Sequence, residues 1–318
     1  MTDNVLSVSS GTNSPTDQRK RRFTLLYTFQ GRDCDELLDQ SSRAMTDVTV
    51  FPPAPAGFDA LTASRTDLMR YGLPQRPDPR THPVPAALWE QRARRYQSYE
   101  HLEPRLTPAT EPADPTIAEL PELMSCGFEL FSNSAPITMF SGTWTVPNLN
   151  YTTGIGQLPN SFRTFFGLGF LDVHVLMSVD PAQSVTSVIT IHTGAQVGLP
   201  VRPGDTISAT LCLLTNETAT AHYFLANQTT KQTVNVQMET GFPPAVTINA
   251  GVSRGLVADR PSPLAKFGAV YFDELTASAS GPTVLLTNGT PTTMVDFDGK
   301  KLATPVRLND FTFKVVHG

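Results

Sequence analysis

Residues 170–180, FLDVHVLMSVD, place a carboxylate, an imidazole and a hydroxyl at alternate positions of one short segment. Successive side chains of a β-strand point to opposite faces. Asp172, His174, Leu176 and Ser178 therefore share one face of the predicted strand. The opposite face is entirely apolar and predicts a core face; it consists of Leu171, Val173, Val175, Met177 and Val179. The polar face is a candidate site for catalysis or for binding.

The residue types on this face resemble those of a nucleophilic relay, but their spacing argues against one. Residues two apart on a strand have Cα atoms about 7 Å apart, too far for a relay without help from neighbouring strands. Asp172 and His174 remain candidates for catalysis, and a hydrogen-bonded histidine in a binding groove is the competing interpretation. His192 and His222 fit exposed strand positions without a three-ligand spacing. We therefore expect no metal and no cofactor.

The bulk composition indicates a globular protein with a sizeable core. Of 318 residues, 40% are hydrophobic and 17% are charged, and the formal net charge is −5. This charge gives no overall basic field for nucleic acid, so no nucleic-acid partner is expected. The basic cluster at residues 19–22 lies in a polar N-terminal stretch and is interpreted as part of a solvated tail.

Cysteine usage and hydropathy limit the class of protein further. Cys34, Cys126 and Cys212 have neither close pairing nor a nearby histidine at ligand spacing, so buried or incidental thiols are expected. No window of about 18 apolar residues exists, so no membrane span is expected. The N-terminus lacks the apolar core of a signal peptide. We expect a cytoplasmic location or one that the sequence leaves unassigned.

Proline and turn residues divide the chain into three parts. Residues 1–60 are predicted to be a largely disordered tail. Residues 61–121 are proline-rich, with one or two short helices, over 64–71 with Ser64 as N-cap and over 86–100. Residues 122–318 contain short β-rich runs with period-two alternation, separated by turn residues. The expected fold is therefore all-β, an antiparallel sandwich with a proline-rich, partly helical N-terminal extension.

Several of these runs, in order, resemble the glutamic peptidase (eqolisin) family. They are FSGTWTVPNL, FFGLGF, VRPGDTISATL, HYFLANQTTKQTVNVQM and LVADRPSPLAKFGAVYFDEL, and LMRYGLPQRPDPRTHP upstream resembles a leader of bacterial members. The resemblance covers about residues 64–318. It implies a concanavalin A-like sandwich (jelly roll) of two seven-stranded sheets, with the substrate groove on a concave face. It also implies a glutamate as general base and a glutamine that stabilises the oxyanion.

This chain departs from that family at both catalytic positions. The glutamine position falls on Leu176, and the glutamate position falls on Gly255 when the alignment is anchored on 259–261. A slip of one residue gives Met177 or Arg254, and neither restores an amide or an acid. Leucine cannot donate a hydrogen bond, and glycine has no side chain to accept a proton.

These observations predict a catalytically inactive relative that binds a peptide or a small molecule in its groove. The expected groove residues are Leu176, Ser178, Arg254 and Gly255. Two alternatives stay open. One is an enzyme, either an acid endopeptidase or a catalyst of another reaction, that uses Asp172 and His174. The other is a lectin-like carbohydrate-binding module, for which the candidate aromatic side chains are Trp144, Phe165 and Phe166. The sequence leaves the oligomeric state open.

Overall fold

The computed structural model describes most of the chain from residue 48 onward. The described ranges are 48–55, 57–108, 121–133, 135–153, 157–191, 195–215, 219–257, 260–279 and 283–318. The tail predicted over residues 1–60 lies outside these ranges as far as residue 47, and Cys34, His192 and residues 19–22 lie outside them as well. No helix among the described residues is long and apolar enough to cross a membrane.

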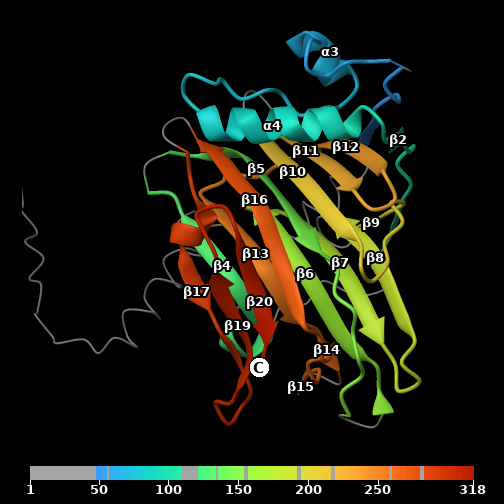
Figure 1. Cartoon of the computed structure of the whole chain (residues 1–318), viewed down its shortest axis with the longest axis vertical. Coiled ribbons are helices and arrows are strands. Elements are labelled where there is room, and N and C mark those ends of the chain that lie inside the picture. The colour runs from blue at the N-terminus through green and yellow to red at the C-terminus, as the bar shows by residue number, and fades with distance from the viewer. Residues whose placement is uncertain are drawn as a thin grey trace, which may run out of the picture. The chain divides into compact units, whose positions relative to one another are not determined.

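Two antiparallel sheets dominate the structure (Figure 1), and the larger one, sheet A, has ten strands. Its order is β1 (Val48–Val50), β12 (Gln232–Thr240), β11 (Ala219–Asn227), β10 (Thr206–Thr215), β5 (Ile137–Thr145), β16 (Ala269–Ala279), β20 (Phe313–His317), β19 (Lys301–Arg307) and β18 (Met294–Val295). The tenth strand, β2 (Glu100–His101), pairs in parallel with β12.

Sheet B has eight strands and carries the segment with the alternating polar residues. Its order is β17 (Thr290–Thr292), β4 (Ser125–Phe131), β13 (Thr247–Arg254), β6 (Asn160–Leu168), β7 (Leu171–Val179), β8 (Val185–Ile191), β9 (Ala195–Val197) and β3 (Leu106–Pro108). A short ribbon of β14 (Leu256–Val257) and β15 (Arg260–Pro261) follows β13. The helical turns α5 (Pro121–Met124) and η4 (Leu286–Asn288) were not predicted, because such short segments show no helical periodicity.

The all-β sandwich predicted from the sequence is confirmed, although both sheets exceed the seven strands that the resemblance implied. The proline-rich extension contributes β1 and β2 beside β12 of sheet A, and β3 beside β9 of sheet B. An edge strand exposes unpaired backbone groups, which favours covering it. The extension therefore wraps around one side of the sandwich and pairs with an edge of each sheet.

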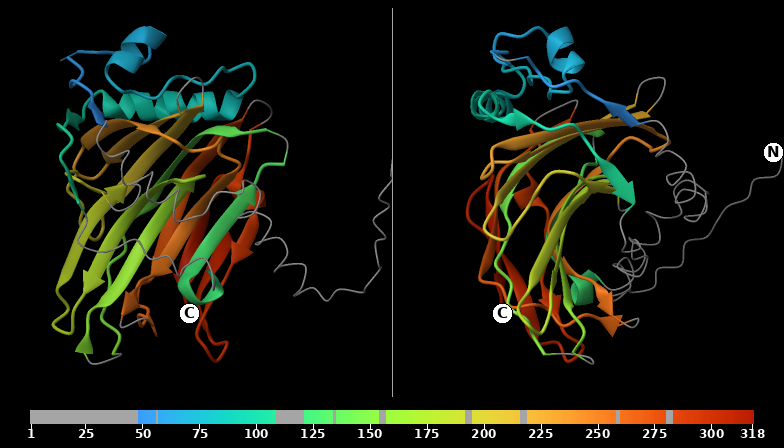
Figure 2. Two further views of the ribbon diagram at one scale, coloured as in Figure 1. Left: turned by 180° about the vertical axis from the view of Figure 1, so that it is seen from behind. Right: turned by 90° about the vertical axis from the view of Figure 1, so that its right-hand side faces the viewer.

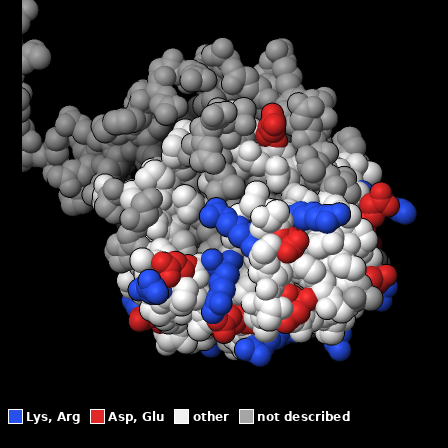
Figure 3. Space-filling view, turned by 90° about the horizontal axis from the view of Figure 1, so that it is seen from above, with Lys and Arg blue, Asp and Glu red and all other residues white. Residues whose placement is uncertain are grey.

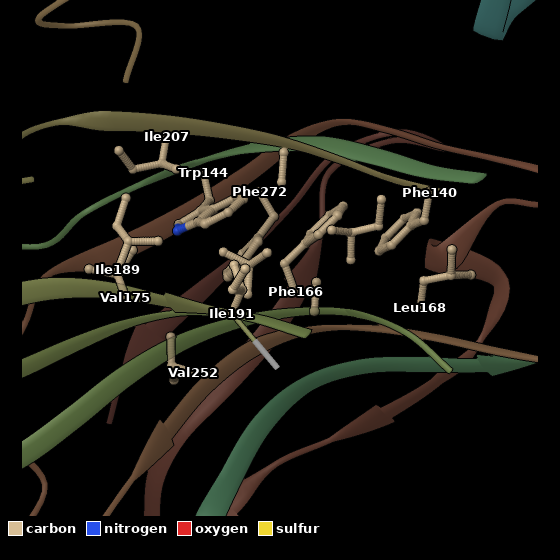
Figure 4. Close-up of a cluster of buried hydrophobic side chains, with 14 of the residues drawn as sticks. Phe140, Trp144, Phe166, Leu168, Val175, Ile189, Ile191, Ile207, Val252 and Phe272 are labelled. Atoms are coloured by element: carbon tan, nitrogen blue, oxygen red, sulfur yellow. The ribbon is translucent and has the colours of Figure 1, made fainter. Parts of the chain in front are cut away.

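Aromatic side chains fill the space between the two sheets (Figure 4). The ring of Phe166 on sheet B lies between two rings of sheet A. Its centroid is 4.0 Å from that of Phe140 in a parallel stack and 5.4 Å from that of Trp144. All three side chains are buried, so this stack joins the inner faces of β5 and β6. Figure 2 shows both sheets curving in the same sense, which makes the outer face of sheet B concave.

Two helices of the extension lie beyond the outer face of sheet A. Helix α3 (Arg65–Arg70) begins after Ser64, whose hydroxyl accepts a hydrogen bond from the Asp67 N–H at 3.1 Å, as expected for an N-cap. Helix α4 (Pro83–Tyr96) starts three residues before the predicted helix, because proline is well tolerated in a first helical turn. Seen from above, cationic and anionic side chains are interspersed over the described surface (Figure 3).

An ion pair network fixes α4 to sheet A. Arg92 Nε lies 3.0 Å from a carboxylate oxygen of Glu274, and Arg92 Nη2 donates to the Glu274 carbonyl at 2.6 Å. Arg95 contacts the same carboxylate. Glu274 lies at an irregularity of β16 and has a φ of 52°, a conformation that is costly for a residue with a side chain. The two arginines hold the residue there.

The covered outer face of sheet A contains a histidine whose environment makes docking dependent on pH. His222 of β11 lies against the ring of Phe51, with centroids 5.3 Å apart. Burial lowers the pKa of His222 from 6.5 to about 4, and a hydrogen bond with the Gly72 backbone opposes this shift. The neutral imidazole therefore stabilises the fold above about pH 6.5. That contribution is lost as the pH falls through the folded-state pKa.

We expect acid to weaken the fold less in a His222→Phe variant than in the wild type. The loss in free energy of unfolding between neutral pH and pH 4 should be smaller in the variant by up to about 3 kcal/mol. Urea titrations at both pH values measure this difference, and circular dichroism at neutral pH checks that the variant is folded. Equal losses in the two proteins would contradict the role of His222.

Candidate binding groove on the concave face

The antiparallel register of sheet B aligns its outward side chains in rows across four strands, because directly opposed residues share a face. Along β7, β6, β13 and β4, the acidic row is Asp172, Gly167, Asn249 and Glu129; the aromatic row is His174, Phe165, Gly251 and Gly127; the arginine row is Leu176, Arg163, Ser253 and Ser125. A serine row follows, with Ser178, Ser161 and Gly255. Neighbouring rows lie about 7 Å apart.

The burial pattern of β7 alternates as its sequence predicted. The five apolar side chains face the core and are buried. Asp172, His174, Leu176 and Ser178 are half-buried on the concave face. The leucine at the centre of this polar face is therefore a surface residue of the groove and not a core residue.

Glycines keep the floor of the groove low. A Cβ atom built on Gly251 would lie 2.8 Å from the ring of Phe165, which covers this glycine. A Cβ atom on Gly167 would lie 2.6 Å from the side-chain oxygen of Asn249. Both distances are shorter than real side chains adopt. The two glycines let the neighbouring side chains lie flat across the sheet.

The two positions that align with the catalytic pair lie on the same face, in adjacent rows. Leu176 is on β7, and Gly255 immediately follows β13, with β6 between the two strands. A Cβ atom on Gly255 would collide with the side chain of Ser161, whose own Cβ would be 2.8 Å away. The guanidinium Nη2 of Arg163 lies 3.5 Å from the same point. Serine and arginine thus surround the place of the family's glutamate.

Arg163 is a central residue of the groove that the sequence analysis missed. It is opposite Leu176 on β6 and has only 8% of its surface exposed. Its Nε is buried without a hydrogen-bond partner. One signal was present in the sequence: a single charged residue interrupts the otherwise apolar and neutral run FRTFFGLGF.

The structure places Arg254 on the inner side of β13, not in the groove. Its guanidinium donates to three backbone carbonyls, those of Leu123 at 2.7 Å, Ser262 at 3.3 Å and Val295 at 3.5 Å. Burial lowers the pKa of Arg254, and the Asp296 carboxylate opposes this shift. Arg254 ties three segments together. We therefore do not assign it to the binding site, although Leu176, Ser178 and Gly255 do share the concave face.

The proposed relay of Asp172, His174 and Ser178 is not assembled. Among the described residues, no hydrogen bond joins His174 to either Asp172 or Ser178. Burial lowers the pKa of His174; the Asp172 carboxylate opposes this shift and the Arg163 cation adds to it. The imidazole is therefore neutral at pH 7. On the acidic row, burial raises the pKa of Glu129.

Metal ligands and sugar-stacking aromatics were also sought on the described residues. They contain no group of three histidine, cysteine, aspartate or glutamate side chains that could hold a metal ion. Trp144 and Phe166, two of the three aromatic candidates for stacking, are buried between the sheets. Phe165 is half-buried on the concave face, where it covers Gly251.

Comparison with known proteins gives a family match and several structural neighbours. The model of the peptidase A4 family matches residues 124–316. A structure of scytalido-glutamic peptidase with a peptide-based transition-state analogue is 14% identical, with a TM-score of 0.47, and covers 62% of this chain and 99% of its own. SCP-B, an eqolisin in complex with the tripeptide Ala-Ile-His, has the same identity and coverage and a TM-score of 0.46. No curated protein matches this chain.

Adjacent residues of β7 offer a direct test of the two faces. Val175→Gln should unfold or aggregate the protein, because it buries an unpaired amide at a cost of about 1–3 kcal/mol in addition to lost packing. Leu176→Gln places an amide of similar size on the half-buried face and should leave the melting temperature nearly unchanged. Thermal melts of both variants decide the matter. Equal damage would mean that Leu176 belongs to the core.

Proposed function

The chain belongs to the peptidase A4 (glutamic peptidase, eqolisin) family, and we propose that it binds a ligand on its concave face without cleaving peptide bonds by the mechanism of that family. One observation carries this proposal. Leu176 and Gly255 occupy the aligned positions of the catalytic glutamine and glutamate, and neighbouring side chains fill the space at Gly255.

Hydrolysis by the family mechanism needs a proton acceptor for water and a donor for the oxyanion. Leu176 lacks the donor, and Gly255 lacks the acceptor. The nearest charged group, the guanidinium of Arg163, has five N–H donors and no acceptor, so it cannot take the proton from water. On the outer face of β4, β13, β6 and β7 the described carboxylates are those of Glu129 and Asp172, both in the acidic row. They lie two rows from the serine row.

The remaining groups of the concave face suit binding. Leu176 and Phe165 are half-buried apolar side chains, and serine, asparagine and arginine side chains surround them. Ligand sites commonly combine an apolar surface with a few polar groups that fix orientation. A peptide or a small molecule with an apolar portion matches this arrangement.

The two alternative functions have weaker support. Catalysis by Asp172 and His174 would need a relay, and no hydrogen bond between described residues forms it. A sugar-binding groove would need exposed aromatic rings, and two of the three candidates are buried. We therefore retain ligand binding without hydrolysis as the proposed function.

The purified protein should not cleave casein or denatured globin between about pH 2 and 5, the range in which a carboxylate base is expected to work. Release of acid-soluble peptides measures cleavage, and a glutamic peptidase that retains both catalytic residues serves as the positive control. Cleavage by this chain that disappears when one groove residue is mutated would overturn the proposal.

Restoring the two catalytic residues alone should not restore activity. In a Leu176→Gln/Gly255→Glu variant, the new Cβ at residue 255 collides with Ser161, and overpacking of this kind typically costs about 1–3 kcal/mol. The melting temperature should fall, and adding Ser161→Gly should recover part of the loss. Melting curves and the same casein assay test both points. A stable and active double variant would contradict the argument that the neighbours have filled the site.

A further inference from the structure

Arg163 is a buried cation that lacks the partners found for comparable arginines in this protein. Arg254 donates to three backbone carbonyls, and Arg92 and Arg95 share the carboxylate of Glu274. No hydrogen bond or ion pair between described residues involves the Arg163 side chain, and its Nε is buried without a partner. A buried charge without a partner is unfavourable. This residue is therefore suited to pair with an anion from outside the fold.

The guanidinium faces a position from which the family's own anion is missing. Its Nη2 lies 3.5 Å from the point where a side chain at Gly255 would begin. In members with the catalytic pair, the carboxylate of the glutamate starts at this position. Here a cation replaces it, so the local charge is inverted. The planar guanidinium fork matches the two oxygens of a carboxylate better than a single point charge does.

Hydroxyl groups around Arg163 provide further donors. Ser253 is opposite Arg163 on β13, and Ser161 is two residues away on the same face of β6. Ser178 is opposite Ser161 on β7. A serine hydroxyl can donate to a carboxylate oxygen that the guanidinium holds. The arginine row and the serine row therefore form the anion-binding end of the groove.

We propose that this end of the groove binds the C-terminal carboxylate of a short, extended peptide, with Arg163 as its principal contact. The proposal rests on the proposed function, because it assigns a ligand class to the same concave face. The half-buried apolar side chains of Leu176, Phe165 and Val188 lie within one row of Arg163 and would contact the peptide's side chains. A free inorganic anion would leave these apolar contacts unused.

The opposite end of the groove limits the charge of the ligand. Asp172 and Glu129 lie in the acidic row, two rows from Arg163, which corresponds to about 14 Å along the strands. An extended peptide spans about 3.3–3.6 Å per residue, so about four residues cover that distance. A second carboxylate would meet these acidic side chains. The groove thus favours a peptide with a single negative end over a diacid.

The test compares peptides with and without the terminal charge. The probes are a mixed library of N-acetylated tetrapeptides with free C-termini, the same library with amidated C-termini, and inorganic phosphate. Calorimetry at neutral pH measures binding to the wild type, Arg163→Gln and Arg163→Lys, with the exposed Arg202→Gln as the matched control. Circular dichroism and thermal melts establish that each variant is folded. The comparison of the libraries on the wild type needs no variant.

We expect the free-carboxylate library to bind the wild type and Arg202→Gln about 10- to 100-fold more tightly than the amidated library, as for a hydrogen bond to a charged group. Arg163→Gln should abolish this preference, and Arg163→Lys should retain part of it. Phosphate should not displace the peptides at equal concentration.

The unfavourable outcomes separate this inference from the proposed function. If both libraries bind the wild type equally, the carboxylate site is wrong and ligand binding in the groove stands. If the preference persists in Arg163→Gln, the assignment to Arg163 is wrong. If phosphate displaces the peptides equally well, the site binds simple anions and the peptide assignment fails. If neither library binds, both the inference and peptide binding in the groove fail.

Discussion

The antiparallel register between β6 and β7 is the constraint on which the concave face depends. It places Arg163 opposite Leu176, and it places Phe165 opposite His174. A shift of one residue would turn the apolar face of β7 toward solvent and Asp172 and His174 into the core. The buried stack of Phe166 with Phe140 and Trp144 opposes such a shift, because Phe166 lies on the inner face of β6. Packing between the sheets thereby determines which side chains reach the groove.

The sequence predicted the sandwich and the two faces of β7 because both depend on a pattern within single strands. Arg163 was missed because its position relative to Leu176 is a relation between strands, which the pattern of one strand does not contain. Arg254 shows the opposite error. Within β13 it shares its phase with the buried Ile248 and Val252, and period two alone would have turned it inward. Alignment with the catalytic position favoured the groove.

The docking of the extension was also beyond sequence patterns. Proline spacing predicted short helices but not the surface that they cover. Helix α4 is held by contacts with residues far along the chain, such as Arg92 with Glu274, and the φ of Glu274 has no signature in the residue itself. The pairing of β3 with β9 likewise joins segments that no local pattern connects. Long-range pairs of this kind depend on the assembled fold.

The changes at the concave face reinforce one another. Without a side chain at Gly255, the side chain of Ser161 occupies that space and the guanidinium of Arg163 approaches it. A glutamate introduced there would have to displace the serine. Its carboxylate would then pair with the arginine, and an ion pair holds a carboxylate in hydrogen bonds that an attacking water would need. General-base hydrolysis and anion binding by Arg163 are therefore mutually exclusive uses of the same position, and the described side chains of this chain favour anion binding.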